Sequence, residues 1–418
     1  MIGIKNCFFD VKKGNEVNKV EKSLEKVAMT EANPNWEFAI KRENQLYKRN
    51  NDLRSEFERD YNRILHCNAY RRLKHKTQVF FSPESDHICT RIEHVSHVES
   101  ISYTVAKYLG LNTELTKAIA IAHDIGHSPF GHAGERILSE ISKRDIGESF
   151  WHEKNGLEFV DKIELLEDDH GNKQNLNLTY AVRDGIISHC GEIDENNLKP
   201  REEAIDLSEY KYPNQFKPYT WEGCVVKIAD KISYLGRDIE DAIRLGILDE
   251  HLDELYHMLN LNHEMILNNT VLINNFIYDL CNNSSIEKGL CFSDEMYILI
   301  NYIKRFNYEK IYIAERLKPS VEYFKLIINQ IYNTLKNTFC GENSLEKINY
   351  YKKYYPKLMN NFEKWLVNYW NNDRNPINQN DSIINVKDEK EYCRAIIYYI
   401  SGMTDNFAID TYNEIIGF

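Results

Sequence analysis

The chain has 418 residues, of which 42% are hydrophobic and 28% charged, a composition typical of a globular protein with a sizeable core rather than a disordered or fibrous one. Its formal net charge of −12 has the wrong sign for a protein that mainly binds nucleic acid non-specifically. No apolar run approaches the roughly 18 residues of a spanning helix, and the opening MIGIKNCFFDVKKGNE does not resemble a signal peptide, so we expect a cytoplasmic protein without a membrane segment.

Helical periodicity dominates the chain. Residues 1–40 are charged and carry no site signature, so we interpret them as an N-terminal extension. Apolar residues then recur at intervals of three and four over 92–109 and 114–124, which predicts two helices. Gly110 is a typical helix stop and Asn112 a typical N-cap, so these two helices should form a hairpin.

The rest of the chain predicts further helices and few strands. The polar stretch 167–177 predicts either a β-turn flanked by short strands or a surface loop. The proline-containing stretch 193–219 predicts a long irregular connection, which is either a functional lid or oligomer contact or a plain surface excursion. Helical periodicity returns over 225–244 and again from residue 300 onward. We therefore predict an all-α fold, with at most a few short strands.

Residues of the predicted hairpin have the chemistry of metal ligands. His123 and Asp124 are adjacent at the end of an apolar helix, and His94 lies on the helix before it, so the hairpin can bring them together. Imidazole and carboxylate groups are ligands that borderline or hard divalent ions accept. Asp230 follows an apolar run and is the best candidate for a fourth ligand, because a buried carboxylate needs a partner. Taken singly, the histidines would be core or capping residues and Asp230 the partner of an arginine, but together the four predict a metal site.

A tight non-helical turn follows the His123–Asp124 pair. It is marked by Gly126, Pro129 and Gly131 and flanked by His127 and His132. Glu135 stands three residues after His132 and shares its face if a helix begins there. A histidine coupled to a carboxylate has the fixed tautomer and raised basicity of a general acid or base. His152, which opens another helical pattern, is a further candidate, although alone it would be a surface histidine.

At these residues the chain resembles the deoxynucleoside triphosphate triphosphohydrolases, the dGTPase family of the HD-domain metal-dependent phosphohydrolase superfamily. Five segments between about residues 50 and 418 carry the resemblance: RSEFERDYNRILHCNAYRRLKHKTQVFF (54–81), TRIEHVSHVES (90–100), IAHDIGHSPFGHAGE (121–135), EGCVVKIADKISYLGRDIEDAIRLGIL (222–248) and GMTDNFAIDTYNEI (402–415). We accordingly divide the chain into the extension over 1–40, an HD-type catalytic core over 41–270, and a C-terminal helical region over 271–418. The last region is expected to pack on the core and contribute to oligomer contacts.

The resemblance implies a role for each residue that matches a family motif. Metal ligands are implied at His94, His123, Asp124 and Asp230, and catalytic work at His132, Glu135 and His152. Phosphate contacts are implied for Arg91 and Lys231, a hydrogen bond to the deoxyribose 3′-hydroxyl for Gln78, and a place in the sugar pocket for Tyr234 and Asp238.

Two positions depart from the family pattern. His97 stands where the family often has Glu, so it is either an additional metal contact or a helix-surface residue. Asn155 stands where Gln is common, so a role for that amide does not carry over directly. The four metal positions are intact.

The activity implied by the resemblance is metal-dependent hydrolysis of deoxynucleoside triphosphates, dGTP among them, to deoxynucleoside and tripolyphosphate. The divalent cofactor is expected to be Mg, Mn, Fe, Co, Ni or Zn, because mixed His and Asp ligands suit several of these ions. The resemblance also implies a homo-oligomer, commonly a hexamer, and in some members a nucleotide activator at a second site. Two alternatives remain: an HD-type nucleotidase or phosphodiesterase that acts on other nucleotides, and a nucleotide-sensing or nucleic-acid-binding protein.

Overall fold

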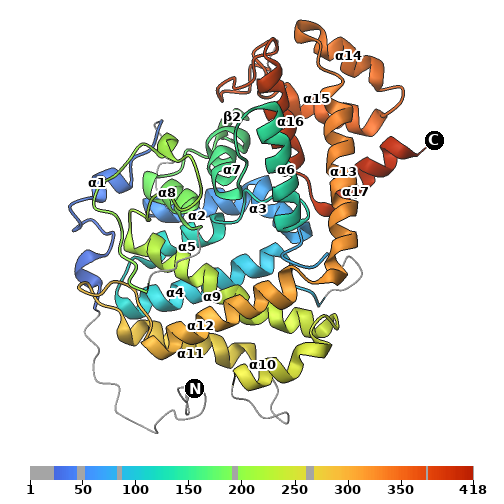
Figure 1. Ribbon diagram of the computed structural model, residues 1–418. Helices are drawn as coiled ribbons and strands as arrows, with labels where there is room; N and C mark the ends of the chain where they lie inside the picture. Colours follow the sequence, from blue (N-terminus) through green and yellow to red (C-terminus); the bar gives the residue numbers. More distant parts are fainter. Residues whose placement is uncertain are drawn as a thin grey trace.

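The protein is built from helices, with a single two-stranded sheet in the part of the chain that the structure describes (Figure 1). The structure is a computed structural model, and it describes residues 23–44, 52–81, 87–190, 196–259, 268–372 and 375–417. The prediction of an all-α fold is confirmed. Within these ranges, no helix combines the length and apolar character needed to cross a membrane.

The hairpin predicted around Gly110 and Asn112 lies at the centre of the fold. α4 (Arg91–Leu109) ends where Gly110 takes a left-handed backbone with a φ of 85°, which glycine tolerates because it has no Cβ. The Asn112 side chain then accepts hydrogen bonds from two backbone N–H groups and begins α5 (Thr113–Ala122). Both helices begin within one residue of the predicted positions.

Four helices surround α5, which is buried along nearly its whole length. Its alanines let neighbouring backbones approach, while Ile119 and Ile121 fill the space between them. The helices packed against it are α2 (Glu56–His66), α4, α8 (Tyr180–Ser188) and α9 (Trp221–Arg244). α9 begins four residues before the predicted 225–244, because the Thr220 hydroxyl caps it by accepting a hydrogen bond from the Gly223 N–H.

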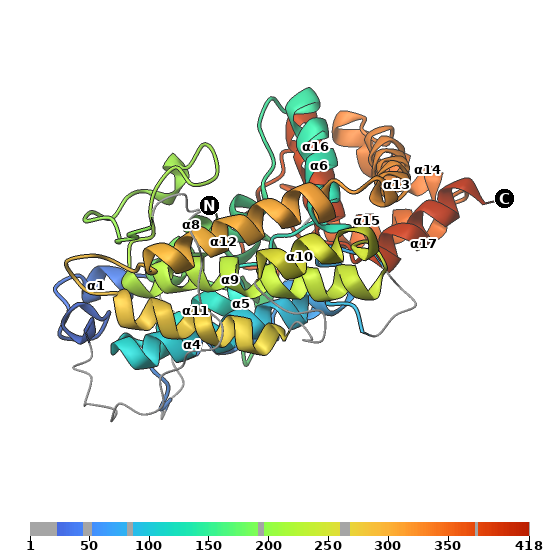
Figure 2. The ribbon, with the colours of Figure 1, turned by 60° about the horizontal axis from the view of Figure 1, so that its bottom comes forward.

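Seven further helices form two groups around this core. α10 (Leu252–Met258), α11 (Asn269–Asn283) and α12 (Asp294–Asn307) lie along one side, where α11 packs on α4 and α9 (Figure 2). In the second group α6 (Gly131–Asp145), α13 (Lys318–Lys336) and α16 (Glu389–Ser401) pack on one another, and α17 (Asp405–Ile416) packs on α13 (Figure 1).

Short elements join these helices. The short α-helices are α1 (Trp36–Ala39), α3 (Asn68–Arg72), α7 (His152–Glu158), α14 (Ser344–Tyr351) and α15 (Pro356–Leu366). The π-helical turns are η3 (Phe159–Ile163) and η6 (Tyr308–Tyr312). The 3-10 turns are η1 (Glu25–Val27), η2 (Leu73–His75), η4 (Leu207–Glu209), η5 (Asp249–His251), η7 (Glu315–Leu317) and η8 (Gly341–Asn343).

The stretch 167–177 was predicted to form either a β-turn flanked by short strands or a surface loop, and two short strands are present. β1 (Leu165–Glu167) pairs antiparallel with β2 (Lys173–Asn175), with Leu165 opposite Asn175. The first alternative for this stretch is therefore right. In the connection 193–219, the described residues from 196 onward carry only the turn η4, as predicted, and residues 193–195 lie outside the described ranges.

Residues near the N-terminus take part in the core. Leu24, Met29 and Ala39 are buried, and the Met29 N–H donates to Glu222 Oε1 at 2.9 Å. Buried apolar residues form one continuous cluster from Leu24 to Ile415. The three-part division of the chain stays a prediction, and most of the predicted extension, residues 1–22, lies outside the described ranges.

Close packing of α8 on α5 leaves no room for a side chain at Gly185. A Cβ there would lie 2.6–2.7 Å from three side-chain carbons of Ile119. We expect Gly185→Ala to lower the free energy of unfolding, measured by urea titration, by about 1–3 kcal/mol despite the better helix propensity of alanine. In a double-mutant cycle, Ile119→Ala should remove most of this cost. Strictly additive effects would contradict the close contact.

Candidate metal centre

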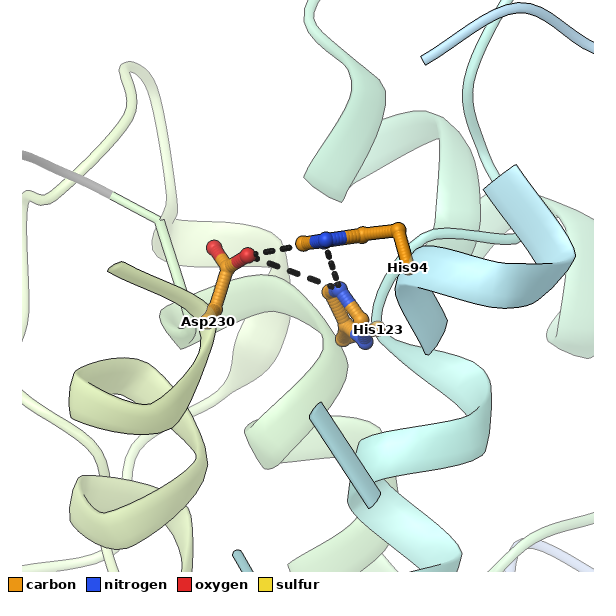
Figure 3. Close-up of side chains that lie close together, drawn as sticks. All are labelled: His94, His123 and Asp230. Carbon is orange, nitrogen blue, oxygen red and sulfur yellow. Dashed lines mark hydrogen bonds and ion pairs between the residues drawn. The ribbon is translucent and has the colours of Figure 1, made fainter. Parts of the chain in front are cut away.

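Three of the predicted ligands converge from three different helices (Figure 3). His94 comes from α4, His123 stands at the C-terminal end of α5, and Asp230 comes from α9. His94 Nε2 lies 3.0 Å and His123 Nε2 3.8 Å from Asp230 Oδ1, and the two Nε2 atoms are 3.4 Å apart. Both imidazoles are buried. Such a set of nitrogen and oxygen donors around one point fits a divalent ion.

Hydrogen bonds on the far side of each ring orient these imidazoles. His123 Nδ1 lies 2.6 Å from the carbonyl oxygen of Ala120, which can only accept, so Nδ1 carries the proton and Nε2 presents its lone pair to the cluster. His94 Nδ1 lies 3.3 Å from the Ser233 hydroxyl. A backbone carbonyl or hydroxyl behind a ligating histidine is the usual arrangement in metal sites. The donor set therefore fits the metal that the sequence implied.

The fourth predicted ligand, Asp124, lies at the edge of this cluster. Its Oδ1 is 3.8 Å from His123 Nε2 and 3.0 Å from His127 Nε2, and its Oδ2 accepts a hydrogen bond from Arg91 Nη1 at 2.6 Å. Burial raises the pKa of the Asp124 carboxyl, but the neighbouring His127 and Arg91 hold it well below its ordinary value. Asp124 is thus a buried carboxylate beside the ligand cluster.

Glu135 connects the predicted catalytic residues. On α6, Glu135 Oε2 lies 3.3 Å from Nδ1 of His132, and Oε1 accepts from the backbone N–H of His152, the first residue of α7, at 2.9 Å. His152 Nδ1 is 3.1 Å from Glu135 Oε1. Burial lowers the pKa of His152, but the carboxylates of Glu153 and Glu135 outweigh it and raise this pKa to about 9. His132, by contrast, has 63% of its side chain exposed.

The turn between Asp124 and α6 is held by close backbone contacts. A Cβ on Gly126 would lie 2.1 Å from the carbonyl oxygen of His152, so only glycine fits there. The Asn155 side chain donates to the Gly126 carbonyl at 2.6 Å. Asn155, which departs from the family pattern, therefore stabilises this loop through the Gly126 carbonyl.

His97 lies outside the ligand clusters of the described residues. It sits one turn along α4 from His94, and its Nε2 is 3.5 Å from Arg237 Nη2. Burial and the Arg237 charge lower its pKa. Of the two alternatives for His97, this contact favours a helix residue over an additional ligand.

All the predicted substrate residues line one cavity of about 570 Å³ beside the ligand cluster. They are Gln78, Arg91, Lys231, Tyr234 and Asp238. Gln78 Oε1 is buried without a hydrogen-bond partner in the protein, as expected of a group that bonds to a bound ligand. Asp238 accepts a hydrogen bond from the Tyr312 hydroxyl at 2.6 Å, and burial raises the pKa of its carboxyl to about 7.

The cavity also includes residues that sequence reasoning did not assign. His189 lies beside His123, its Nδ1 donates to the Ile186 carbonyl at 2.7 Å, and burial lowers its pKa to about 3. Like His123, it directly follows an apolar helix, and that shared signal would have identified it. A further group comes from η6 to α13 and carries no local signal: Tyr308, Tyr312, Arg316, Leu317, Ser320, Val321 and Phe324.

Comparisons with known proteins agree with this geometry. The family model for the HD domain matches residues 91–235, the part of the chain that contains the predicted ligands. The chain is 33% identical over 365 residues to a deoxyguanosinetriphosphate triphosphohydrolase-like protein of Caldanaerobacter subterraneus, with 87% of this chain and 86% of that protein covered. A protein of the same name from Rickettsia conorii is 31% identical, with 90% and 95% covered, and one from Desulfatibacillum aliphaticivorans is 35% identical, with 68% and 74% covered.

The helical fold and the buried His and Asp cluster define an HD-domain phosphohydrolase that depends on a divalent metal. Within that class, the chain belongs to the family of deoxyguanosinetriphosphate triphosphohydrolase-like proteins. The predicted family is therefore confirmed.

Replacing single histidines of α4 tests which of them binds the metal. We expect His94→Ala to weaken Mn²⁺ binding by at least about tenfold, because one of the converging nitrogens is lost. His97→Ala is the matched control and should bind Mn²⁺ as the unchanged protein does. Metal content after dialysis, measured by mass spectrometry, gives the answer. Equal losses in the two variants would contradict the assignment of His94.

Proposed function

We propose that this protein hydrolyses deoxynucleoside triphosphates to deoxynucleoside and tripolyphosphate. The observation that carries the proposal is the shared cavity, which brings the ligand cluster together with Arg91, Gln78 and Asp238. Its volume of about 570 Å³ lies in the range of small-molecule sites, and its contents include cationic groups for phosphates as well as polar groups for a sugar. The names of the relatives support the same substrate class.

The metal ligands in this proposal are His94, His123, Asp124 and Asp230. A divalent ion held by them would polarise the α-phosphate and lower the pKa of a water molecule toward neutrality. Asp124 Oδ1 faces this cluster, while Oδ2 stays bonded to Arg91. Arg91 is thereby held beside the proposed ligands in the same cavity.

Arg91 and Lys231 stabilise the negative charge of the triphosphate. Arg91 is buried and fixed by hydrogen bonds to Asp124 and to the carbonyl of Gln78, so its guanidinium needs no reorganisation when substrate binds. Lys231 neighbours Asp230 on α9 and lines the same cavity. Charge stabilisation of this kind is the main demand of phosphoryl transfer.

Proton transfer falls to the histidines around Glu135. In the reaction a water molecule that has lost one proton to solvent attacks Pα through its oxygen, the bond from Pα to the 5′ oxygen breaks, and the 5′ oxygen takes up a proton. His132 donates that proton, oriented by the Glu135 carboxylate 3.3 Å away. His152, held by the same carboxylate, keeps Glu135 in place and adds positive charge.

The sugar is held by Gln78, Tyr234 and Asp238, which line the same cavity. Gln78 accepts or donates a hydrogen bond at the 3′-hydroxyl, and Asp238 stands nearby on α9. In this proposal Tyr234, which lines the same cavity, is the wall that excludes a 2′-hydroxyl. The protein therefore discriminates against ribonucleotides. A homo-oligomer and a nucleotide activator at a second site remain predictions of the family resemblance.

The products of the reaction test the proposal directly. Incubation with Mn²⁺ and each of the four deoxynucleoside triphosphates should release deoxynucleoside and tripolyphosphate, which chromatography separates. Asp124→Ala should abolish the reaction, whereas His97→Ala should not. Release of monophosphate or inorganic phosphate would instead identify an HD-type nucleotidase or phosphodiesterase.

Replacing His132 tests the proton donor. We expect His132→Ala to lower turnover by about 10²- to 10⁴-fold, because the leaving oxygen loses its acid, while the metal content stays unchanged. His66→Ala, an exposed histidine at the end of α2, is the control. Unchanged turnover in His132→Ala would remove this residue from the mechanism.

Sugar selectivity is measured by comparing GTP with dGTP. We expect kcat/KM for dGTP to exceed that for GTP by at least about 100-fold, and Tyr234→Ala to reduce this ratio. Equal turnover of the two nucleotides by the unchanged protein would show that the cavity does not exclude the 2′-hydroxyl.

A further inference from the structure

The motif GMTDNFAIDTYNEI near the end of the chain has no role in the chemistry described so far. It forms the corner after α16 and most of α17, far from the HD helices in sequence. We propose that Asp405, at this corner, is a positioning residue that holds the turn between Asp124 and α6 in its active shape. The effect on turnover rests on the proposed function, whereas the effect on the turn itself does not.

The Asp405 carboxylate joins two segments of the cavity wall. Oδ1 accepts a hydrogen bond from the Phe130 N–H and Oδ2 accepts one from the Thr77 N–H, each at 2.8 Å. Asp405 is only 4% exposed, so these two backbone groups replace the water that the charge has lost. Bonds from N–H groups to a buried carboxylate are among the stronger hydrogen bonds in proteins.

Phe130 is the residue of this turn that most needs support. Its φ is 63°, in the left-handed region that a bulky side chain rarely adopts, and such a backbone persists only where its surroundings hold it. It stands at the N-cap of α6, and no side chain there caps the helix. The direction in which α6 presents His132 and Glu135 therefore depends on the conformation that Asp405 stabilises.

The second bond holds the segment that carries Gln78. Thr77 directly precedes Gln78, whose carbonyl accepts a hydrogen bond from Arg91 Nη2 at 3.3 Å. The Lys76 carbonyl accepts one from the backbone N–H of Arg91 at 3.1 Å. The Asp405 carboxylate thus fixes two segments relative to each other: the turn next to His132 and the segment next to Arg91.

Ser401 adds further contacts from the same corner. The buried Lys76 Nζ donates to the carbonyls of both His127 and Ser401. The Asn155 amide donates to the Gly126 carbonyl and to the Ser401 hydroxyl at 3.2 Å. These contacts reach the turn at three of its backbone groups: the carbonyls of Gly126 and His127 and the N–H of Phe130.

Asp405→Asn tests the proposal in the full-length protein. Asn keeps the size of the side chain but offers one acceptor oxygen where two N–H groups need one each. We expect kcat for dGTP to fall at least about tenfold, with a smaller rise in KM, because a small displacement of catalytic groups has large effects on rate. The metal content should stay close to that of the control Asp410→Asn, an exposed carboxylate on the same helix, and the melting temperature should fall by a few degrees at most, because one buried N–H group loses its partner.

Amide hydrogen exchange provides a readout that needs no turnover. We expect exchange at Phe130 and Thr77 to accelerate at least about tenfold in Asp405→Asn and not in Asp410→Asn, because local protection follows the hydrogen bonds that are lost. If the unchanged protein hydrolyses no nucleotide, the proposed function fails and the exchange still decides the role of Asp405. Exchange and kcat equal to those of Asp410→Asn, or a loss of kcat that merely follows a loss of metal or of folding, would overturn the proposal.

Discussion

Burial of two imidazoles and one carboxylate among apolar helices, beside a second carboxylate that is partly exposed, is the constraint on which the rest of this site depends. His94, His123 and Asp124 are buried and the Asp230 side chain is 23% exposed, so an unpartnered polar group is costly in this cluster and each member needs a defined partner. The backbone carbonyl behind His123 and the arginine beside Asp124 meet that need from outside the cluster. What remains inside is a set of donor atoms directed at one another, which a divalent cation satisfies.

The surrounding helices and turns fix the positions of these groups relative to one another. α5 is narrow because alanines alternate with larger residues, so α4 and α9 approach closely enough for His94 and Asp230 to meet. Gly126 allows the following turn to press against α7, and Asn155 fixes it there. Near the C-terminal end of the chain, Ser401 bonds to Asn155 and Asp405 bonds to the N–H of Phe130 in this turn. Loss of geometry at any of these contacts would displace groups that the chemistry requires in fixed positions.

Charge is distributed in the cavity in a way that suits a polyanionic substrate on an acidic protein. The chain as a whole carries a formal charge of −12, yet Arg91, Lys227 and Lys231 line the same cavity. Burial lowers the pKa of Lys227 to about 8, which reflects the low polarity of its surroundings. In such surroundings a few cations outweigh the distant surface carboxylates.

Much of the fold and of the site was predictable from local sequence. The hairpin of α4 and α5 follows from apolar periodicity together with Gly110 and Asn112, because helix starts and stops are local properties of the backbone. His123 and Asp124 stand out because adjacent polar ligands end an apolar helix, and the residues of the following turn are equally distinctive. The start of α9 was misplaced by four residues because its cap depends on Thr220, outside the apolar pattern.

The sequence alone determined which residues have the chemistry for metal binding, proton transfer and phosphate contact, since these properties belong to side chains and their near neighbours. Only the tertiary structure decided that Asp124 pairs with Arg91, that His97 turns toward Arg237, and that Glu135 contacts His152 as well as His132. It also decided that η6, α13 and Asp405 border the site. The contacts between helices join segments that range from 17 residues apart, as for Glu135 and His152, to 275 residues apart, as for Phe130 and Asp405. Their geometry follows from how whole helices pack, which no local pattern encodes.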